Sequence, residues 1–389
     1  MKTKLNFLLI IDTDIKMKHS SKTFYYYLDL IRWISAFLVV IGHIRSILFL
    51  DFSQIHDSNL AIKLFYFITG IGHEAVIIFF VLSGYLVGGQ VIKNISNGEF
   101  IWIEYLIKRT SRLYIVLIPC LVFGLIIDSI GINYFNNLGS YTHSNIYNIA
   151  SINYSILDRT NIPTFLANLF MLQTSFLETF GSNGPLWSLA YEFWYYILFP
   201  IIIYILKNNF MNVKKTFVYL TLILSLSFLL NEQIFLYMII WIAGALISLI
   251  TKSYFNTMIS ALLLLTYIFL SKYLNYDIGF YKDLLLCFFV CILINSFVDS
   301  KSKTYFQNIN SKLADFSYTL YLFHFPFSLL VLSSMSLIKL EATSTTFIYF
   351  LLIIILVYIY SFIIYLFFEN NTGVIRNYLL RKLSKKEIL

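Results

Sequence analysis

The sequence predicts an all-α protein that is integral to a membrane, with about ten transmembrane helices. Hydrophobic residues make up 59% of its 389 residues, charged residues only 12%, and the mean hydropathy is +0.77. Soluble domains contain roughly 45–50% apolar and about 25% charged residues, so a surface this apolar requires lipid as its solvent. The composition therefore excludes an ordinary soluble globule, and its low polarity also excludes a disordered chain.

Ten apolar runs are long enough, or nearly so, to cross the hydrocarbon core of a bilayer, which takes roughly 20 residues. The runs 216–231 and 255–271 are short, so one pair could form a re-entrant or tilted element instead. The ten runs lie at 28–50, 62–91, 113–131, 185–206, 216–231, 234–251, 255–271, 283–299, 313–337 and 345–368. They predict a tail over 1–27, a membrane domain over 28–368 and a basic tail over 369–389.

Basic residues set the predicted orientation. If the N-terminus is inside, the cytoplasmic segments hold 21 of the 28 lysines and arginines, and the outer segments hold six. Because cytoplasmic loops carry the excess of Lys and Arg, both termini are expected in the cytoplasm. The formal net charge of +8 is then explained by topology, and no nucleic-acid partner is expected.

The polar connection over 132–164 is the longest in the chain, faces outward in this topology and could cover an external acceptor site. The next run, 165–176, is too short to span and is expected to lie in the interface or to dip beneath that connection. No cleavable signal peptide is expected, because acidic residues interrupt the short N-terminal apolar run. The chain could start at Met1 or at Met17.

The cysteines predict neither a disulfide framework nor a metal site. All three lie in apolar runs, where cysteine usually acts as a small packing residue. They are Cys120, Cys287 and Cys291.

Ionisable residues inside the predicted spans are the first candidates for a functional site, because a charge in lipid is costly. In the first span Arg32 and His43 are eleven residues apart. This spacing brings them to within about 20° of one helix face, about 16 Å apart along the axis. They could line a polar cavity. Alternatively, Asp29 pairs with Arg32, and His43 is a hydrogen-bonded packing residue.

The second span, GHEAVIIFFVLSGYLVGG, places His73 and Glu74 near its predicted outer end. A carboxylate in an otherwise apolar helix is better explained by function or by pairing than by packing. Four small residues further along allow helix backbones to approach closely, and packing alone can explain them. These are Ser83, Gly84, Gly88 and Gly89.

The cytoplasmic connection before the third span ends with Arg109 and Arg112. They lie one helical turn apart, so both guanidinium groups could hold one anionic group such as a phosphate. The alternative is an anchor that touches lipid headgroups on the cytoplasmic side.

Ser188 and Glu192 follow at i,i+4 on one face of the fourth span, at the predicted membrane level of His43, His73 and Glu74. A carboxylate beside an imidazole can orient it, and histidine, with an ordinary pKa near 6.5, suits a general base. Glu192 could equally be a buried carboxylate whose hydrogen bonds are satisfied.

The ninth span contains SYTLYLFHFPF, with Ser317, Tyr321 and His324 at roughly helical spacing. Pro326 follows and is expected to kink the helix. The alternative for His324 is a hydrogen-bonded core histidine.

Together these motifs resemble the membrane acyltransferase-3 family, multi-pass enzymes that acylate sugars of bacterial surface glycans and some small molecules. The resemblance covers nearly the whole chain. It depends on five segments in order: LDLIRWISAFLVVIGH, GHEAVIIFFVLSGYL, the Arg109-x2-Arg112 pair with LYIVLIP, PLWSLAYEFWYYILFP, and SYTLYLFHFPF. It implies transfer of an acyl group, usually acetyl from cytoplasmic acetyl-CoA, to a hydroxyl outside the bacterial inner membrane.

The resemblance also implies roles for residues. His43 is the essential histidine, either as general base or as a carrier of the acyl group, with Glu192 and Arg32 completing the catalytic group. The residues expected to bind substrate are Arg109, Arg112, Ser188, Glu74, His73, Tyr321 and His324. Acyl-CoA is then a donor substrate and not a permanently bound cofactor. The other expected partners are a glycan or lipid-linked sugar and membrane lipids.

Two other classes of membrane protein stay open at this point. In a transporter or flippase of lipid-linked sugars, intramembrane charges would line a translocation path, although no inverted repeat is visible. A glycan polymerase would change glycan chain length instead of ester content. The sequence predicts neither the acceptor sugar, nor the acyl chain, nor the oligomeric state.

Overall fold

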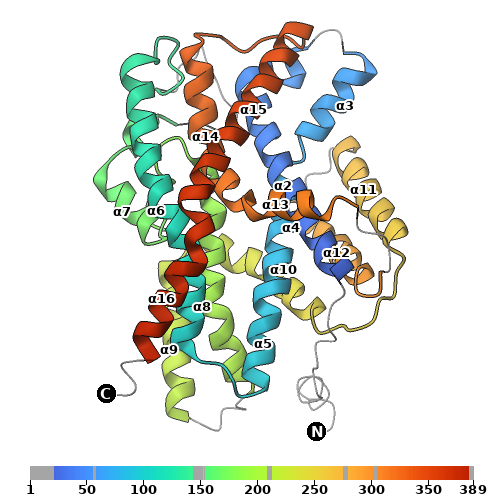
Figure 1. The fold of residues 1–389 in the computed structure, drawn as a ribbon, viewed down its shortest axis with the longest axis vertical. Coiled ribbons are helices and arrows are strands. Elements are labelled where there is room, and N and C mark those ends of the chain that lie inside the picture. Colours follow the sequence, from blue (N-terminus) through green and yellow to red (C-terminus); the bar gives the residue numbers. More distant parts are fainter. Residues whose placement is uncertain are drawn as a thin grey trace. The chain divides into compact units, whose positions relative to one another are not determined.

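The computed structural model describes residues 22–55, 58–142, 152, 154–207, 213–274, 279–300 and 305–384. Over these residues the chain is helical, with two isolated bridges, Phe49–Leu340 and Gln173–Leu177, as its extended pairings (Figure 1). The prediction of an all-α protein is confirmed. The predicted tails and the connection over 132–164 lie partly outside the described residues.

The chain forms two compact units, each assembled from three stretches of sequence. The first unit comprises 1–32, 76–101 and 191–311, and the second comprises 33–75, 102–190 and 312–389. Four helices pass from one unit to the other: α2 (Lys22–Leu48), α4 (Gly72–Ser83), α8 (Trp187–Lys207) and α13 (Gln307–Asp315).

In the first unit, α10 (Glu232–Ile247) packs against α5 (Gly89–Ser96) and against η2 (Gly84–Gly88), a π-helical turn that interrupts the second predicted span. On another side α10 contacts α12 (Phe280–Ser296), which in turn packs on α11 (Thr257–Tyr273). The same unit contains α9 (Val213–Leu229).

Glycine makes the contact between η2 and α10 possible. A Cβ added at Gly84 would lie 1.9 Å from the Trp241 carbonyl oxygen, and one added at Gly244 would lie 2.2 Å from the Val81 carbonyl oxygen. Because no side chain fits in these gaps, the two backbones touch directly. The close helix contact predicted from the small residues is confirmed.

The second unit is built around α14 (Ser317–Ser334), which packs against α6 (Trp102–Tyr134) and α15 (Ser344–Phe367). α16 (Thr372–Ser384) also contacts α6. The short helix α7 (Ile162–Leu169) lies against α6 as well, and it has only eight residues. As expected for the run 165–176, α7 is too short to cross a membrane.

Side-chain caps start many of these helices. Each capping oxygen accepts a hydrogen bond from a backbone N–H of the first turn, which the helix itself leaves without a partner. The caps are Asn59 for α3 (Leu60–Thr69), Asn161 for α7, Asn231 for α10, Asn256 for α11 and Thr343 for α15.

Five helical segments of the described chain are long and apolar enough to cross a membrane: Lys22–Leu48, Leu60–Ser96, Trp102–Tyr134, Gly184–Lys207 and Ser344–Leu383. α13 and α14 form a sixth if the pair, bent by 54°, counts as one span. Helices α9 to α12 match the remaining predicted runs, but they have only 16 or 17 residues. At 1.5 Å per residue this is about 25 Å, short of the roughly 30 Å hydrocarbon core. The structure supports five or six spans, and the count of about ten stays a prediction.

Candidate functional site

His43 of α2 and His324 of α14 lie side by side in the second unit. Their ring centroids are 5.3 Å apart, with the planes inclined by 35°. The ring of Phe325 stands edge-on to His43, at 5.0 Å. His324 and Phe325 are both fully buried. Two imidazoles from distant parts of the chain therefore share one apolar surrounding.

Hydrogen bonds fix the tautomer of His324. Its Nδ1 lies 2.8 Å from the Tyr321 carbonyl oxygen and 3.2 Å from that of Leu320. A carbonyl oxygen only accepts, so Nδ1 carries the proton and the neutral ring keeps a lone pair on Nε2. This Nε2 is buried and has no hydrogen-bond partner among the described residues. His324 is thus a hydrogen-bonded core histidine that still offers one basic nitrogen.

Pro326 explains the polar contacts of the next turn of α14. A proline has no N–H, so the carbonyl of Leu322, four residues earlier, loses its helical partner. The Asn183 side-chain amide donates to this oxygen at 2.8 Å, and the Cys120 thiol donates to it at 3.2 Å. The segment before α8 and helix α6 are thereby attached to α14 within one turn of His324.

Ser188 and Tyr321 form a second attachment between α8 and α14. Their hydroxyl groups are 2.8 Å apart, and each also reaches the Pro185 carbonyl oxygen at 3.2 Å. Both side chains are buried. The sequence predicted both residues as parts of the site, and the structure adds the hydrogen bond that joins them.

Glu192 lies one turn after Ser188 on α8, as predicted, and its described partners belong to the first unit. Its Oε1 accepts hydrogen bonds from Ser83 and Tyr196, both at 2.5 Å. Trp241 donates its indole N–H to the same serine hydroxyl at 3.1 Å. Glu192 is therefore hydrogen-bonded, as the alternative interpretation expects, but it is half-buried and not fully buried. Its role in orienting His43 stays a prediction.

The charged residues of the first two spans are held in different ways. Arg32 pairs with Asp29 at 3.3 Å, with about a quarter of each side chain exposed. This is the ion pair considered as the alternative for Arg32. Glu74 is buried in the first turn of α4, where the helix dipole favours a carboxylate, whereas His73 beside it is exposed.

The paired arginines lie in the N-terminal part of α6. Arg112 is exposed, and Arg109 is half-buried with its guanidinium carbon 5.7 Å from the centre of the Tyr105 ring. Lys108, next to them, forms an ion pair with Glu104 at 3.2 Å. The one-turn spacing that could hold a phosphate is thus present, on an accessible stretch of helix.

Asp128 is a buried residue of the second unit that the sequence interpretation missed. Its carboxylate accepts hydrogen bonds from the Ser182 backbone N–H at 2.8 Å and from the Ser182 hydroxyl at 2.7 Å. Gly181 has a φ of +57°, and a Cβ there would lie 2.1 Å from an Asp128 oxygen. The available signal was a lone carboxylate in the apolar run 113–131. Asp128 anchors the segment that carries Asn183.

The described part of the predicted outer connection is held to the same segment. The Arg159 guanidinium carbon lies 3.2 Å from the centre of the Tyr154 ring, and its side chain pairs with Glu178 at 3.6 Å. The Gly181 N–H donates to the Arg159 carbonyl oxygen. Burial raises the pKa of Tyr154, and the nearby Arg159 charge acts in the opposite direction.

Within the described ranges, no group of three or more His, Cys, Asp or Glu side chains could hold a metal ion. The site instead consists of two imidazoles, two hydroxyl groups and an amide. Such an arrangement can accept a proton and can hydrogen-bond a neutral substrate.

Residues 25–366 match the acyltransferase-3 model, described as an acyltransferase domain. The chain therefore belongs to this family, as the five motifs predicted, and it is an acyl-transferring enzyme.

The chain is also similar to two other proteins. The chain is 29% identical to an O-acetyl transferase of Shigella phage Sf6 over 280 residues, which cover 66% of this chain and 73% of the phage protein. It is also 29% identical to an uncharacterised protein of Haemophilus influenzae over 151 residues, 38% of this chain and 55% of that protein. No solved structure matches the chain.

Proposed function

We propose that the protein is a membrane O-acetyltransferase that moves an acetyl group from cytoplasmic acetyl-CoA to a hydroxyl of a surface glycan. The observation that carries this proposal is the contact between His43 and His324, with a basic nitrogen on a ring of fixed tautomer. The similarity to a phage O-acetyl transferase supports acetyl as the transferred group and an oxygen as its acceptor.

In the proposed reaction His43 is the general base. The acceptor O–H gives its proton to His43, and its oxygen attacks the carbonyl carbon of the thioester. The carbon–sulfur bond breaks, and the coenzyme A thiolate leaves and takes up the proton held by His43, which restores the base. We propose that, once substrate is bound, the ring N–H of His43 turns to the lone pair of His324 Nε2, which has no hydrogen-bond partner among the described residues, and that this contact orients the base. General-base catalysis of this kind contributes about 10²–10⁴-fold to a rate.

The donor enters from the cytoplasmic side. Arg109 and Arg112 bind phosphates of coenzyme A as a fork, because two guanidinium groups one turn apart match an anion. Arg32 and Glu192 complete the proposed catalytic group with His43. The groups proposed to hold the acceptor are His73, Glu74, Ser188 and Tyr321.

The topology follows from the distribution of charge. We place both tails, 1–27 and 369–389, in the cytoplasm and the domain over 28–368 in the bacterial inner membrane. In this arrangement α9 to α12 also cross, which gives about ten spans. The excess of 21 over six basic residues supports this orientation. The partners are acyl-CoA, a glycan or lipid-linked sugar, and lipids, with no permanently bound cofactor.

The test measures the ester-linked acetyl content of the cell's surface polysaccharide by NMR. It compares wild type, a deletion strain, and the deletion strain complemented with His43→Ala at equal protein level. We expect one acetyl resonance to disappear in both defective strains while glycan length is unchanged. An unchanged acetyl content would contradict the surface-glycan acceptor. A changed glycan length would favour a polymerase or a transporter.

A further inference from the structure

Helix α16 brings a third arginine to the pair on α6, within the second unit. α16 packs on α6 (Figure 1), and its sequence, TGVIRNYLLRKLS, contains no acidic residue. From its second residue on, the half-buried positions of α16 are Gly373, Arg376, Leu380 and Leu383. Residues spaced by three and four share one face of a helix. Because α16 packs against α6, this covered face, with Arg376 in it, turns towards α6.

The paired arginines lie on the face of α6 that turns towards the start of α16. The ring of Phe123 on α6 contacts that of Phe368, which precedes η5 (Glu369–Asn371), with the ring centroids 6.4 Å apart. Arg112 and Arg109 come 11 and 14 residues before Phe123. At about 100° per residue, they lie within about 20° and 40° of the direction in which Phe123 points. Both arginines therefore share a helix face with the residue that contacts Phe368.

Helix α14 holds both sides of this contact. The Tyr318 hydroxyl donates to the carbonyl oxygen of Leu113, the residue after Arg112, at 3.3 Å. The Glu369 carboxylate of η5 accepts hydrogen bonds from the Thr319 N–H at 3.1 Å and from the Thr319 hydroxyl at 2.6 Å. Two adjacent residues in the first turn of α14 thus attach α6 beside its arginines and the segment that leads into α16.

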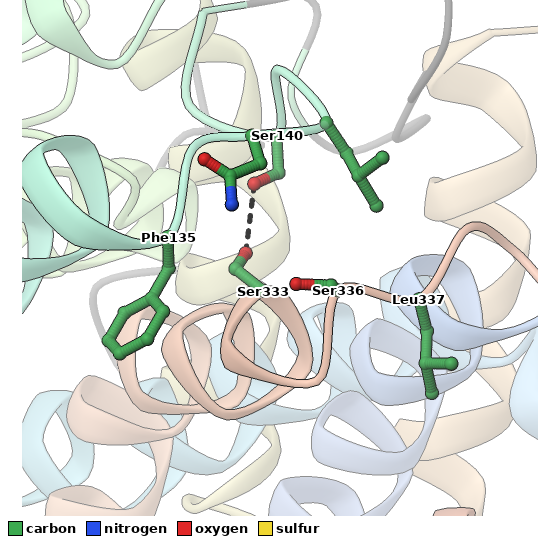
Figure 2. Close-up of a pocket in the computed structure, with 7 residues that line it drawn as sticks. Phe135, Ser140, Ser333, Ser336 and Leu337 are labelled. Atoms are coloured by element: carbon green, nitrogen blue, oxygen red, sulfur yellow. Dashed lines mark hydrogen bonds between the residues drawn. The ribbon is translucent and has the colours of Figure 1, made fainter.

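The other end of α6 is attached to α14 as well. Beyond Tyr134, where α6 ends, the Ser140 hydroxyl lies 2.9 Å from that of Ser333, as Figure 2 shows. The buried ring of Tyr141 fills the space that a side chain at Gly131 would occupy. Because α6 is attached to α14 at both levels, it is a firm support for a binding site.

The three arginines also lie at similar levels along the two helices. α6 and α16 run in opposite directions (Figure 1), so the residues before Phe123 lie beside the residues after Phe368. At 1.5 Å per residue, Arg112 is about 16 Å before Phe123, and Arg376 is about 12 Å beyond Phe368. The difference of about 4 Å is less than one helical turn. Arg376 therefore faces the arginine pair.

Among the described residues, little negative charge offsets these arginines. Glu104 is the one carboxylate in the first three turns of α6, and it pairs with Lys108 at 3.2 Å. Arg376 forms no ion pair within the described ranges. Neighbouring like charges repel each other, so an anion that binds between Arg376 and the pair on α6 relieves this repulsion. Phosphate suits such a place, because a guanidinium group can bind it through two parallel hydrogen bonds.

Coenzyme A carries an anion for each part of this site, namely a diphosphate and a separate phosphate on the 3′ oxygen of its ribose. In the proposed function, the fork of Arg109 and Arg112 binds phosphates of the donor. Two guanidinium groups one turn apart match the two phosphates of the diphosphate. The 3′-phosphate then needs a further cation, and Arg376 supplies it.

A soluble ligand fits this position better than a lipid headgroup does. The apolar part of the segment Ser344–Leu383 ends at Phe368, and Arg376 lies about 12 Å further along. Headgroups extend only about 5–8 Å beyond the hydrocarbon core on each side. In the proposed topology Arg376 thus lies beyond the headgroups, on the cytoplasmic side, where the donor is dissolved.

We infer that Arg376 is a specificity-determining residue that binds the 3′-phosphate of coenzyme A, beside the arginine pair that binds the diphosphate. The inference rests on the proposed function and adds how its donor is recognised. The protein should therefore distinguish acetyl-CoA from the same thioester without this phosphate.

The experiment measures the Kd of the purified full-length protein in detergent for acetyl-CoA and for acetyl-3′-dephospho-CoA, by isothermal titration calorimetry. We expect wild type to bind acetyl-CoA about tenfold more tightly, as for one charge-assisted hydrogen bond. Arg376→Gln should bind both compounds with the Kd that wild type has for the dephospho compound. Arg109→Gln should weaken both by the same factor, because both contain the diphosphate.

Arg381→Gln is the matched control. It removes the same charge from the same helix, but Arg381 is exposed and lies five residues, or about 140°, from Arg376 around α16. This variant should keep the wild-type preference for acetyl-CoA. An unchanged Kd of Arg376→Gln for the dephospho compound shows that this variant is folded.

Two results would overturn the inference and leave the proposed function standing. In the first, wild type binds acetyl-CoA but has no preference for the 3′-phosphate. In the second, Arg376→Gln keeps the wild-type preference, as expected if Arg376 binds lipid headgroups or only packs on α6. If wild type binds neither compound, the donor in the proposed function is wrong and the inference fails with it.

Discussion

Asn183 donates its side-chain amide to the Leu322 carbonyl oxygen at 2.8 Å, and this is the oxygen that Pro326 leaves without a helical partner. The contact joins the segment before α8 to α14, two residues before His324. The carbonyl oxygen that proline leaves without a helical partner in α14 thus accepts the hydrogen bond that positions the segment before α8. The histidine pair depends on this attachment for the placement of α14.

Asn183→Ala is expected to destabilise the second unit by about 1–3 kcal/mol, the usual cost of losing a partner of a buried polar group. Cys120→Ala is the graded control, because it removes only the weaker donor to the same oxygen. Thermal unfolding in detergent measures both. Equal midpoints for Asn183→Ala and wild type would show that the amide does not hold α14.

His43 and His324 are expected to act as a unit in catalysis. His43→Ala and His324→Ala should each lower the rate of acetyl transfer about 10²–10⁴-fold. The double variant should be scarcely slower than either single variant, because removing either member already removes the unit. Tyr321→Phe keeps the ring and the backbone carbonyl that orients His324, so it should retain much more activity. Multiplicative losses in the double variant would indicate independent roles.

Gly181→Ala is expected to destabilise the protein by about 1–3 kcal/mol, as overpacking does, and also to lower activity. The substitution adds a Cβ at a φ of +57°, 2.1 Å from an Asp128 oxygen. Gly124→Ala on α6 is the matched control, since a Cβ there meets nothing within 4 Å and alanine favours the helix by roughly 0.5–1 kcal/mol. The melting temperature of each variant is measured. It should fall in Gly181→Ala and stay equal or rise in Gly124→Ala.

Arg109→Gln and Arg112→Gln are expected to raise the KM for acetyl-CoA about tenfold each, the cost of one charge-assisted hydrogen bond, with a smaller effect on kcat. Lys108→Gln controls for loss of positive charge, because Lys108 already pairs with Glu104 and is half exposed. Steady-state kinetics at fixed glycan concentration measure all three. A KM for acetyl-CoA that stays at its wild-type value would leave lipid headgroups as the ligands of these arginines.

The sequence predicted the helices better than their contacts. Apolar length and spacing place both ends of α8 and α15 within two residues, because these properties are local, whereas α2 and α6 begin well before the predicted runs 28–50 and 113–131. The pairing of His43 with His324 joins residues far apart in the chain, and no periodicity within one helix reports it. Asp128 was missed although it lies within the predicted run 113–131, because one carboxylate scarcely changes the hydropathy of that run. Whether α9 to α12 span the membrane also stays a prediction, because helix length is the only evidence for it and these helices are barely long enough.

The π-helical turn over Gly84–Gly88 has a consequence for how related sequences should align. In this turn the Gly89 N–H reaches back five residues to the Gly84 carbonyl oxygen, so the turn holds one residue more than an α-helical turn. Each inserted residue rotates everything after it by about 100°. Relatives that keep an uninterrupted α-helix here should therefore show a one-residue gap between positions 84 and 88. Without the inserted residue, the glycines that follow the turn would point away from α10. Relatives should therefore have both the inserted residue and the close contact with α10, or neither.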